Sequence, residues 1–195
     1  MSVNKVHLTL NDINQMTLAV GEDWAIAHAK RLIELGREIG ADLPFDHEVF
    51  ELAAYLHDWG AFPKYFQKNV EHAIRSRQIV EAEIIFHLDL TPAQNDALLE
   101  AIELHDYRDT RPTKSNEALL LREADMLEFL GMIGLARDFA RGPKNVETCY
   151  KRILSRHDEI QGRFTLPRAQ EIASIRLQRM ETSLGWLLEE SFGVL

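Results

Sequence analysis

One stretch of the chain organises the rest: Ala53-Ala54-Tyr55-Leu56-His57-Asp58-Trp59-Gly60. The apolar face of this segment begins at Val49 with helical spacing, and Asp46 stands where a helix-capping residue is expected. The helix delivers an imidazole and a carboxylate side by side before Gly60 lets the chain turn away. Two adjacent groups of this kind at the end of a buried helix indicate a metal site, with further ligands arriving from other helices.

The neighbouring segments also have helical patterns. Apolar residues from Glu22 to Ile39 recur at steps of three and four, which places His28 on the buried stripe. The segment Thr91-Pro92-Ala93-Gln94 has the residues of a capping box, with proline at the first helical position. His105 lies on the apolar face of the helix that follows. No segment alternates apolar and polar residues over the length of a strand, so the chain is expected to be all-α.

Four further helices are expected, and two of them carry polar groups near their apolar faces. His72 lies in the first turn of a helix over Glu71 to His87. Asp125 lies on the apolar stripe of a helix that Ser115 can cap and that Gly142-Pro143 ends. An unpaired charge among apolar neighbours would cost several kcal/mol, so Asp125 is expected to have a partner. The other two helices are expected around Val146 to Gln161 and Pro167 to Glu190.

The composition is that of an ordinary globular protein, with 46% hydrophobic and 27% charged residues. The formal net charge of -9 argues against binding to duplex nucleic acid, because that affinity comes largely from Lys and Arg. A long apolar run and a basic-then-apolar amino terminus are both missing, so neither a membrane span nor a secretory signal is expected, and the cytoplasm is the expected location. Cys149 is the single cysteine, which excludes an internal disulfide.

A set of histidines and aspartates falls on the apolar stripes, or at helix ends next to them. Each alone would usually be a hydrogen-bonded core residue, but the set indicates a metal site, because ligation satisfies buried imidazoles and carboxylates together. Ligands without a thiolate favour a catalytic divalent ion, with Fe or Mn preferred and Mg, Co, Ni or Zn as alternatives. The set is more than one catalytic ion needs, so one or two ions per chain are expected. Its members are His28, His57, Asp58, His72, His105 and Asp125.

The order His28, His57-Asp58, Asp125 on separate helices resembles the HD-domain superfamily of metal-dependent phosphohydrolases. The similar region runs from about Asp23 to Ala140. The apolar approach to the His-Asp dipeptide is similar to that of the family, and so is the segment Arg122-Glu123-Ala124-Asp125-Met126-Leu127-Glu128.

The resemblance implies a single all-helical domain over residues 1–195, with a core at about 23–140 and C-terminal helices at 141–195 packed on it. It implies that one ion is held by His28, His57, Asp58 and Asp125. His72 and His105 occupy the places of the two additional histidines in binuclear members, where Asp58 would bridge the ions.

The implied reaction is hydrolysis of a phosphomonoester or phosphoanhydride in a nucleotide or a similar small phosphorylated metabolite. A bound ion lowers the pKa of water to about 7 in favourable cases, so that hydroxide can attack phosphorus at neutral pH. Asp58 is the expected catalytic bridging residue, and Lys64 is a candidate catalytic and substrate-binding residue, although the family's lysine follows its glycine directly. Further candidate phosphate contacts are Arg122, Arg108 and Arg111, because the paired N–H donors of a guanidinium group can bind two phosphate oxygens at once.

Two other functions would use the same residues. The chain could be a regulatory HD module that binds metal and nucleotide without turnover. It could instead be a di-iron oxygenase with the same ligands, as in related HD folds. The substrate, the number of ions and the oligomeric state stay open at this point, and a homodimer is one option for the last.

Overall fold

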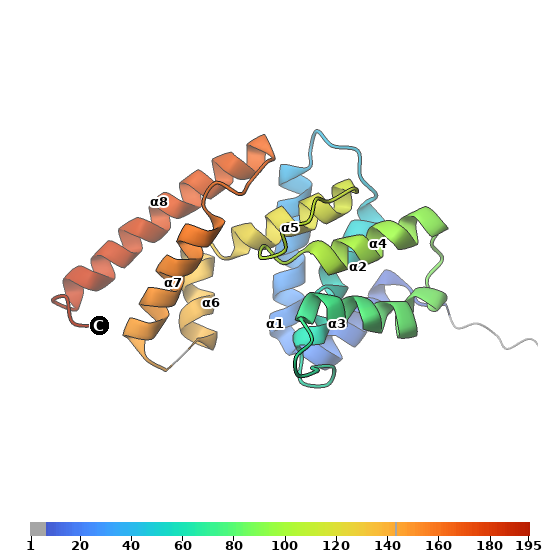
Figure 1. Cartoon of the computed structure of the whole chain (residues 1–195), viewed down its shortest axis with the longest axis horizontal. Coiled ribbons are helices and arrows are strands. Elements are labelled where there is room, and N and C mark those ends of the chain that lie inside the picture. The colour runs from blue at the N-terminus through green and yellow to red at the C-terminus, as the bar shows by residue number, and fades with distance from the viewer. Residues whose placement is uncertain (1–6, 143) are drawn as a thin grey trace, which may run out of the picture. The chain divides into compact units, whose positions relative to one another are not determined.

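The computed structural model describes residues 7–142 and 144–195, which form helices and connecting loops (Figure 1). No strand occurs among these residues, so the predicted all-α class is confirmed. Short turns follow α2 and α3, namely η1 (Trp59–Ala61), the π-turn η2 (Val80–Ile84) and η3 (Ile85–His87). The α-helices are α1 (Leu10–Ile39), α2 (His47–Leu56), α3 (His72–Ile79), α4 (Pro92–Leu104), α5 (Asn116–Glu128), α6 (Gly131–Arg141), α7 (Val146–Ile160) and α8 (Pro167–Glu190).

The described chain divides into two compact units, the first ending at Arg122 and the second spanning Glu123–Leu195. In the first unit α2 packs against α1 and α4, and α3 packs against α4 and η1. Its core includes the fully buried Leu32, Leu56 and Ile102. In the second unit α6 packs against α7 and α8. The expected single domain stays a prediction.

The capping residues read from the sequence lie at the helix starts. Thr91 and Gln94 form the expected capping box, with Gln94 N–H donating to Thr91 Oγ1 and Thr91 N–H donating to Gln94 Oε1. Asp46 accepts hydrogen bonds from the N–H groups of Glu48 and Val49, and its other oxygen accepts one from Gln94 Nε2 at 2.7 Å. The starts of α2 and α4 are therefore tied together through Asp46.

Two predicted helices were too long. The helix expected over Glu71 to His87 leaves α-geometry after Ile79, where η2 and η3 take over. The helix expected from Ser115 toward Gly142 ends at Glu128, and α6 begins at Gly131 with a φ of 70°. This left-handed conformation suits glycine and interrupts the helical hydrogen bonding.

The helix expected over Glu22 to Ile39 corresponds to the part of α1 that follows a non-helical break at Glu22, where φ is 56°. A further helical stretch from Leu10 precedes this break. Gly21 precedes the break, and a Cβ at this position would lie 2.5 Å from the Phe62 ring. No helix in the described part of the chain is long and apolar enough to cross a membrane.

Candidate metal centre

The centre begins at the end of α2, where His57 and Asp58 leave the helix. His57 still has helical backbone angles, and its Nδ1 lies 3.0 Å from the carbonyl oxygen of Ala54. A carbonyl can only accept, so Nδ1 carries the proton and Nε2 keeps its lone pair. The Nε2 atom lies 3.5 Å from Asp58 Oδ2. His57 therefore presents a ligand-competent nitrogen beside the carboxylate.

The turn after Asp58 is held by contacts to α1 and α3. The buried indole of Trp59 donates from Nε1 to Thr17 Oγ1 at 3.0 Å. Gly60 N–H donates to Ser76 Oγ at 2.8 Å, and a Cβ on Gly60 would lie 2.4 Å from the carbonyl oxygen of His72. Only glycine allows α3 to approach the turn this closely, which brings His72 toward Asp58.

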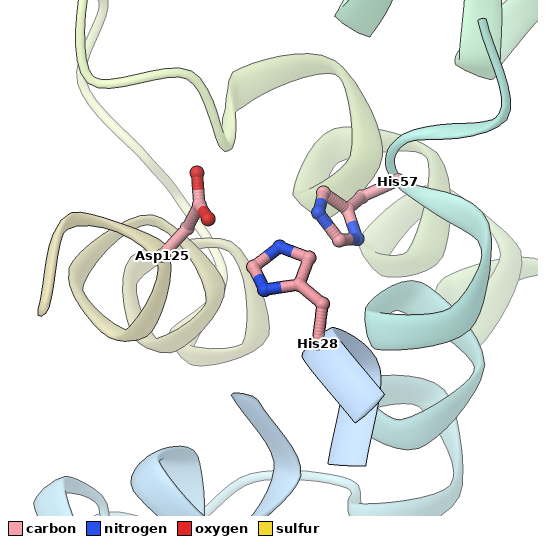
Figure 2. Close-up of side chains that lie close together, drawn as sticks. All are labelled: His28, His57 and Asp125. Carbon is pink, nitrogen blue, oxygen red and sulfur yellow. The ribbon is translucent and has the colours of Figure 1, made fainter. Parts of the chain in front are cut away.

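His28 reaches the same carboxylate from α1. Its ring centroid lies 5.2 Å from that of His57, and Figure 2 shows the two rings projecting from separate helices toward one another. His28 Nε2 lies 4.0 Å from Asp58 Oδ2, the oxygen that also faces His57. One oxygen of Asp58 thus serves the pair His28 and His57.

The other oxygen of Asp58 faces a second pair of histidines. Oδ1 lies 3.5 Å from His72 Nε2 and 3.8 Å from His105 Nε2. These two Nε2 atoms are 3.0 Å apart. His105 Nδ1 lies 2.7 Å from the carbonyl oxygen of Ile102, which assigns the proton to Nδ1 as in His57. The two oxygens of Asp58 therefore face two different pairs of histidines.

The charge of Asp58 is set by opposing effects. Burial works to raise the pKa of Asp58, but the four surrounding histidines outweigh it and bring the pKa to about 2. The carboxylate is therefore ionised at neutral pH. Among the four histidines, His72 is the most accessible, with 25% of its side chain exposed against 1% for His105. Asp58 itself is 20% exposed, so the centre opens to solvent on the His72 side.

The residues fit a divalent ion on grounds of chemistry and spacing. Ligand atoms of His57, Asp58 and His105 all lie within 4.8 Å of one another. A hydrogen bond from Nδ1 to a backbone carbonyl is the usual support of a metal-binding histidine. The 3.0 Å separation of the His72 and His105 nitrogens suits neighbouring ligands at the usual metal–nitrogen distance of roughly 2.0–2.1 Å.

The sixth predicted ligand, Asp125, lies on α5 one helical turn beyond Leu121, and its side chain is buried. Figure 2 labels this carboxylate together with His28 and His57. Its role as a ligand stays a prediction.

The four predicted phosphate contacts have different surroundings. Lys64 is exposed, with Nζ 4.7 Å from the Tyr65 ring centroid. The Arg108 guanidinium pairs with Asp106, and burial is outweighed by this hydrogen bond so that the pKa of Arg108 is raised. The phosphate contacts of Lys64 and Arg108 stay predictions.

The other two arginines hold the loop between α4 and α5. Arg111 pairs with Asp109 and with Glu103, both through short hydrogen bonds. Arg122 Nε donates to the carbonyl oxygen of Leu104 at 2.7 Å, and its Nη1 donates to that of Arg111 at 3.0 Å. Their present partners are thus within the protein, and a phosphate contact would be additional.

Two features near His72 were missed by sequence reasoning. Asp106 Oδ2 lies 3.7 Å from His72 Nδ1, although the only signal in the sequence is that Asp106 follows His105. A cavity of about 440 Å³ includes His72 and the exposed ring of Phe66 in its lining. The sequence around Phe66, which also contains Phe62 and Tyr65, gave no signal for this cavity.

The comparisons with known proteins agree on one family and fold. The family model described as HD domain matches residues 25–130. YpgQ from Bacillus subtilis is 21% identical, with a TM-score of 0.69 over 93% of this chain and 94% of YpgQ. YpgQ in complex with ADP gives 19% identity and a TM-score of 0.68 over 93% and 97% of the two chains.

A predicted HD superfamily hydrolase from an uncultured Thermotogales bacterium is 21% identical, with a TM-score of 0.64 over 93% of this chain and 90% of that one. None of the curated proteins matches the sequence.

Proposed function

The chain belongs to the HD domain family, and from this premise we propose that it is a metal-dependent phosphohydrolase that acts on a nucleotide or a similar small phosphorylated metabolite. The observation that carries the proposal is the position of Asp58, whose two oxygens face two different pairs of histidines. This arrangement suits a pair of divalent ions. Paired ions are common in enzymes that cleave phosphate esters, because they act on both the attacking and the leaving oxygen.

We assign His28, His57, Asp58 and Asp125 to one ion, and Asp58, His72 and His105 to the other. Asp125 is included because its buried carboxylate can supply an oxygen ligand to a divalent ion. Fe or Mn is favoured, since the donors are imidazole and carboxylate without thiolate. Bound ions supply a water of lowered pKa and neutralise charge on phosphoryl oxygens.

The protein's own residues contribute charge and access. Asp58 stays ionised across the range in which enzymes are assayed, because its pKa lies near 2. His28, His57 and His105 are buried, which excludes bulk water from one side of the centre. The substrate phosphate is proposed to enter beside His72, the more exposed histidine. Lys64 and Arg108 are the favoured phosphate contacts, because both are mostly exposed, whereas Arg122 is held by backbone carbonyls.

A nucleotide is favoured as the substrate class by one comparison. YpgQ, which shares the fold, has been crystallised with ADP. Divalent ions held at Asp58 would supply the positive charge that a di- or monophosphate requires. We therefore place nucleotides first in a substrate screen.

The test is anaerobic purification with elemental analysis, followed by phosphate release from a panel of nucleotides and other phosphorylated metabolites with the metal found. We expect turnover that is lost in His57→Ala and Asp58→Ala, with the helical circular-dichroism signal retained. Turnover by a metal-depleted Asp58→Ala variant would exclude the proposed centre. Metal binding without turnover across the panel would favour a regulatory module, and oxygen-dependent loss of a substrate would favour a di-iron oxygenase.

A further inference from the structure

The cavity beside His72 has a composition that the hydrolysis of phosphate does not require. Its volume of about 440 Å³ lies within the range of small-molecule sites, which is roughly 300–1,000 Å³. Its lining includes His72 of the proposed metal centre together with Phe66 and Asn69. A ligand in this cavity would therefore touch the proposed metal centre and an aromatic ring at the same time.

Phe66 is exposed in the loop between η1 and α3, and it lines the cavity. The ring is 64% exposed, although a phenylalanine usually buries its side chain. The preceding Tyr65 stacks on Trp59 with ring centroids 5.5 Å apart and an interplanar angle of 11°. Arg75 Nε donates to the carbonyl oxygen of Tyr65 at 3.0 Å, and Phe66 N–H donates to that of Phe62 at 2.9 Å. The loop is thus held at Tyr65, while Phe66 faces the cavity.

The polar groups of the cavity match a ligand with hydrogen-bonding edges. The side-chain amide of Asn69 offers both a donor and an acceptor, as the edges of nucleobases require. The carboxylate of Glu71 also lines the cavity and lies 3.8 Å from Arg108 Nη2. The carboxylate of Glu71 disfavours a phosphate within the cavity, so the anionic end of a ligand is assigned to the metal centre and the uncharged end to Phe66.

We propose that this cavity is the base-binding subsite of the enzyme, in which a nucleobase stacks on Phe66 while its phosphates reach the centre at Asp58 and His72. The inference rests on the proposed function, since it assumes that the centre binds phosphate. Aromatic stacking of a base is worth a substantial fraction of nucleotide affinity and tolerates different bases, because every base has a π-face. The subsite therefore predicts selection for nucleotides over base-free phosphates, with modest discrimination among the bases.

The test compares two probes whose P–C–P bridge cannot be hydrolysed: α,β-methylene ADP and the base-free methylenediphosphonate. Dissociation constants are measured by calorimetry on the metal-loaded protein. In Phe66→Ala we expect affinity for α,β-methylene ADP to fall about 10-fold, which corresponds to the lower half of the range for stacking on one base. Affinity for methylenediphosphonate should change by less than about 2-fold on the same scale. Phe66→Trp should retain the affinity for α,β-methylene ADP.

Phe86→Ala is the matched control, because Phe86 is also 64% exposed but does not line the cavity. It should leave both dissociation constants unchanged. Equal losses for the two probes in Phe66→Ala, no loss for either, or no binding of α,β-methylene ADP would each overturn the subsite. If Phe66→Ala does not change the rate of phosphate release or the affinity for either probe, the proposed hydrolase is supported and the subsite is rejected. Binding of α,β-methylene ADP that depends on Phe66, without hydrolysis of any phosphate, would support the subsite and remove the hydrolase.

Discussion

The carboxylate of Asp106 lies beside the ring of His72, with 3.7 Å between Asp106 Oδ2 and His72 Nδ1. Burial works to raise the pKa of Asp106, but hydrogen bonds from Arg108 outweigh it and hold the pKa below its ordinary value. Asp106 is therefore an anion held in place by Arg108. A carboxylate behind a metal-binding histidine orients the ring and makes it a stronger ligand.

We predict that Asp106→Asn lowers the affinity for the second ion, the one that we assign to Asp58, His72 and His105, about 10-fold or more. This is the usual effect of removing the carboxylate partner of a metal-binding histidine. The affinity for the other ion, assigned to His28, His57, Asp58 and Asp125, should not change, because Asp106 contacts His72 and not these histidines. Competition with a metal chelator, followed by elemental analysis, measures the two affinities separately.

Asp109→Asn is the control for this prediction. Asp109 pairs with Arg111 in the same spacing as Asp106 with Arg108. The substitution therefore removes a similar ion pair, while the carboxylate beside His72 is that of Asp106 and stays in place. Equal effects of Asp106→Asn and Asp109→Asn on the second ion would show that loop stability, and not the orientation of His72, is responsible.

Gly60→Ala should separate α3 from the turn that carries Asp58. A Cβ at this position would lie 2.4 Å from the carbonyl oxygen of His72 and 2.7 Å from the backbone nitrogen of Ser76, and neither backbone atom can move without α3. If the proposed centre holds two ions, we expect the metal content to fall toward one ion per chain, because His72 would move away from Asp58.

Gly185→Ala provides the contrast. Gly185 lies inside α8, and no heavy atom would lie within 4 Å of its added Cβ. Alanine favours a helix over glycine by about 1 kcal/mol, so this variant should be as stable as the parent or more stable, with unchanged metal content. A Gly60→Ala protein that binds two ions with parental affinity would contradict the role given to the close approach.

The hydroxyl of Thr17 is predicted to stabilise the fold around the centre. Thr17 Oγ1 accepts the indole hydrogen bond of Trp59 and donates to the carbonyl oxygen of Tyr55 at 3.2 Å, all within the buried core. Thr17→Val leaves the indole N–H without its acceptor, which should cost about 1–3 kcal/mol in the free energy of unfolding. Urea denaturation measures this change.

Thr17→Ser should recover much of the stability, because the hydroxyl is retained. Thr182→Val is a surface comparison: its hydroxyl donates to the carbonyl oxygen of Gln178 in an exposed part of α8. This variant should change the free energy of unfolding by less than about 0.5 kcal/mol. A similar cost for Thr17→Val and Thr182→Val would show that the buried position has no special importance.

The helices and their caps could be predicted because their signals are local. The capping box at Thr91 depends on residues three positions apart, and the buried stripe of α1 follows from spacing that places His28 inward. The position of His28 near Asp58 also follows from such a stripe, since buried faces of packed helices meet. Whether these side chains bind metal stays a prediction, as ligation was inferred from the set of residues.

The other features depend on tertiary structure or on backbone geometry that the apolar pattern does not reveal. The apolar stripe continues past Glu128, yet Gly131 adopts a left-handed conformation and Met132 is 58% exposed. The contact of Asp106 with His72 joins the loop after α4 to the start of α3, and no sequence spacing predicts it. The exposure of Phe66 depends on the conformation of its loop, in which the neighbouring Tyr65 stacks on Trp59.

The link between Asp46 and Gln94 predicts a pH dependence of stability. Burial works to raise the pKa of Asp46, but the Gln94 hydrogen bond and the backbone N–H groups of Val49 and Glu48 outweigh it, so the pKa lies below the ordinary 3.8. A carboxyl whose pKa is lowered by folding stabilises the protein above its ordinary pKa. That contribution is lost as the pH falls through the lowered value.

Asp46→Asn cannot titrate, and its one amide oxygen can accept the hydrogen bonds from Glu48 and Val49 but leaves Gln94 Nε2 without its acceptor. We expect the parent to exceed Asp46→Asn in the free energy of unfolding at pH 7, with the difference shrinking as the pH falls below about 4, near the ordinary pKa of aspartate. Urea denaturation of both proteins at a series of pH values isolates this carboxyl, because the other acidic groups are common to both. A difference that stays constant down to pH 3 would mean that the lost acceptor for Gln94, and not the charge of Asp46, accounts for the change in stability.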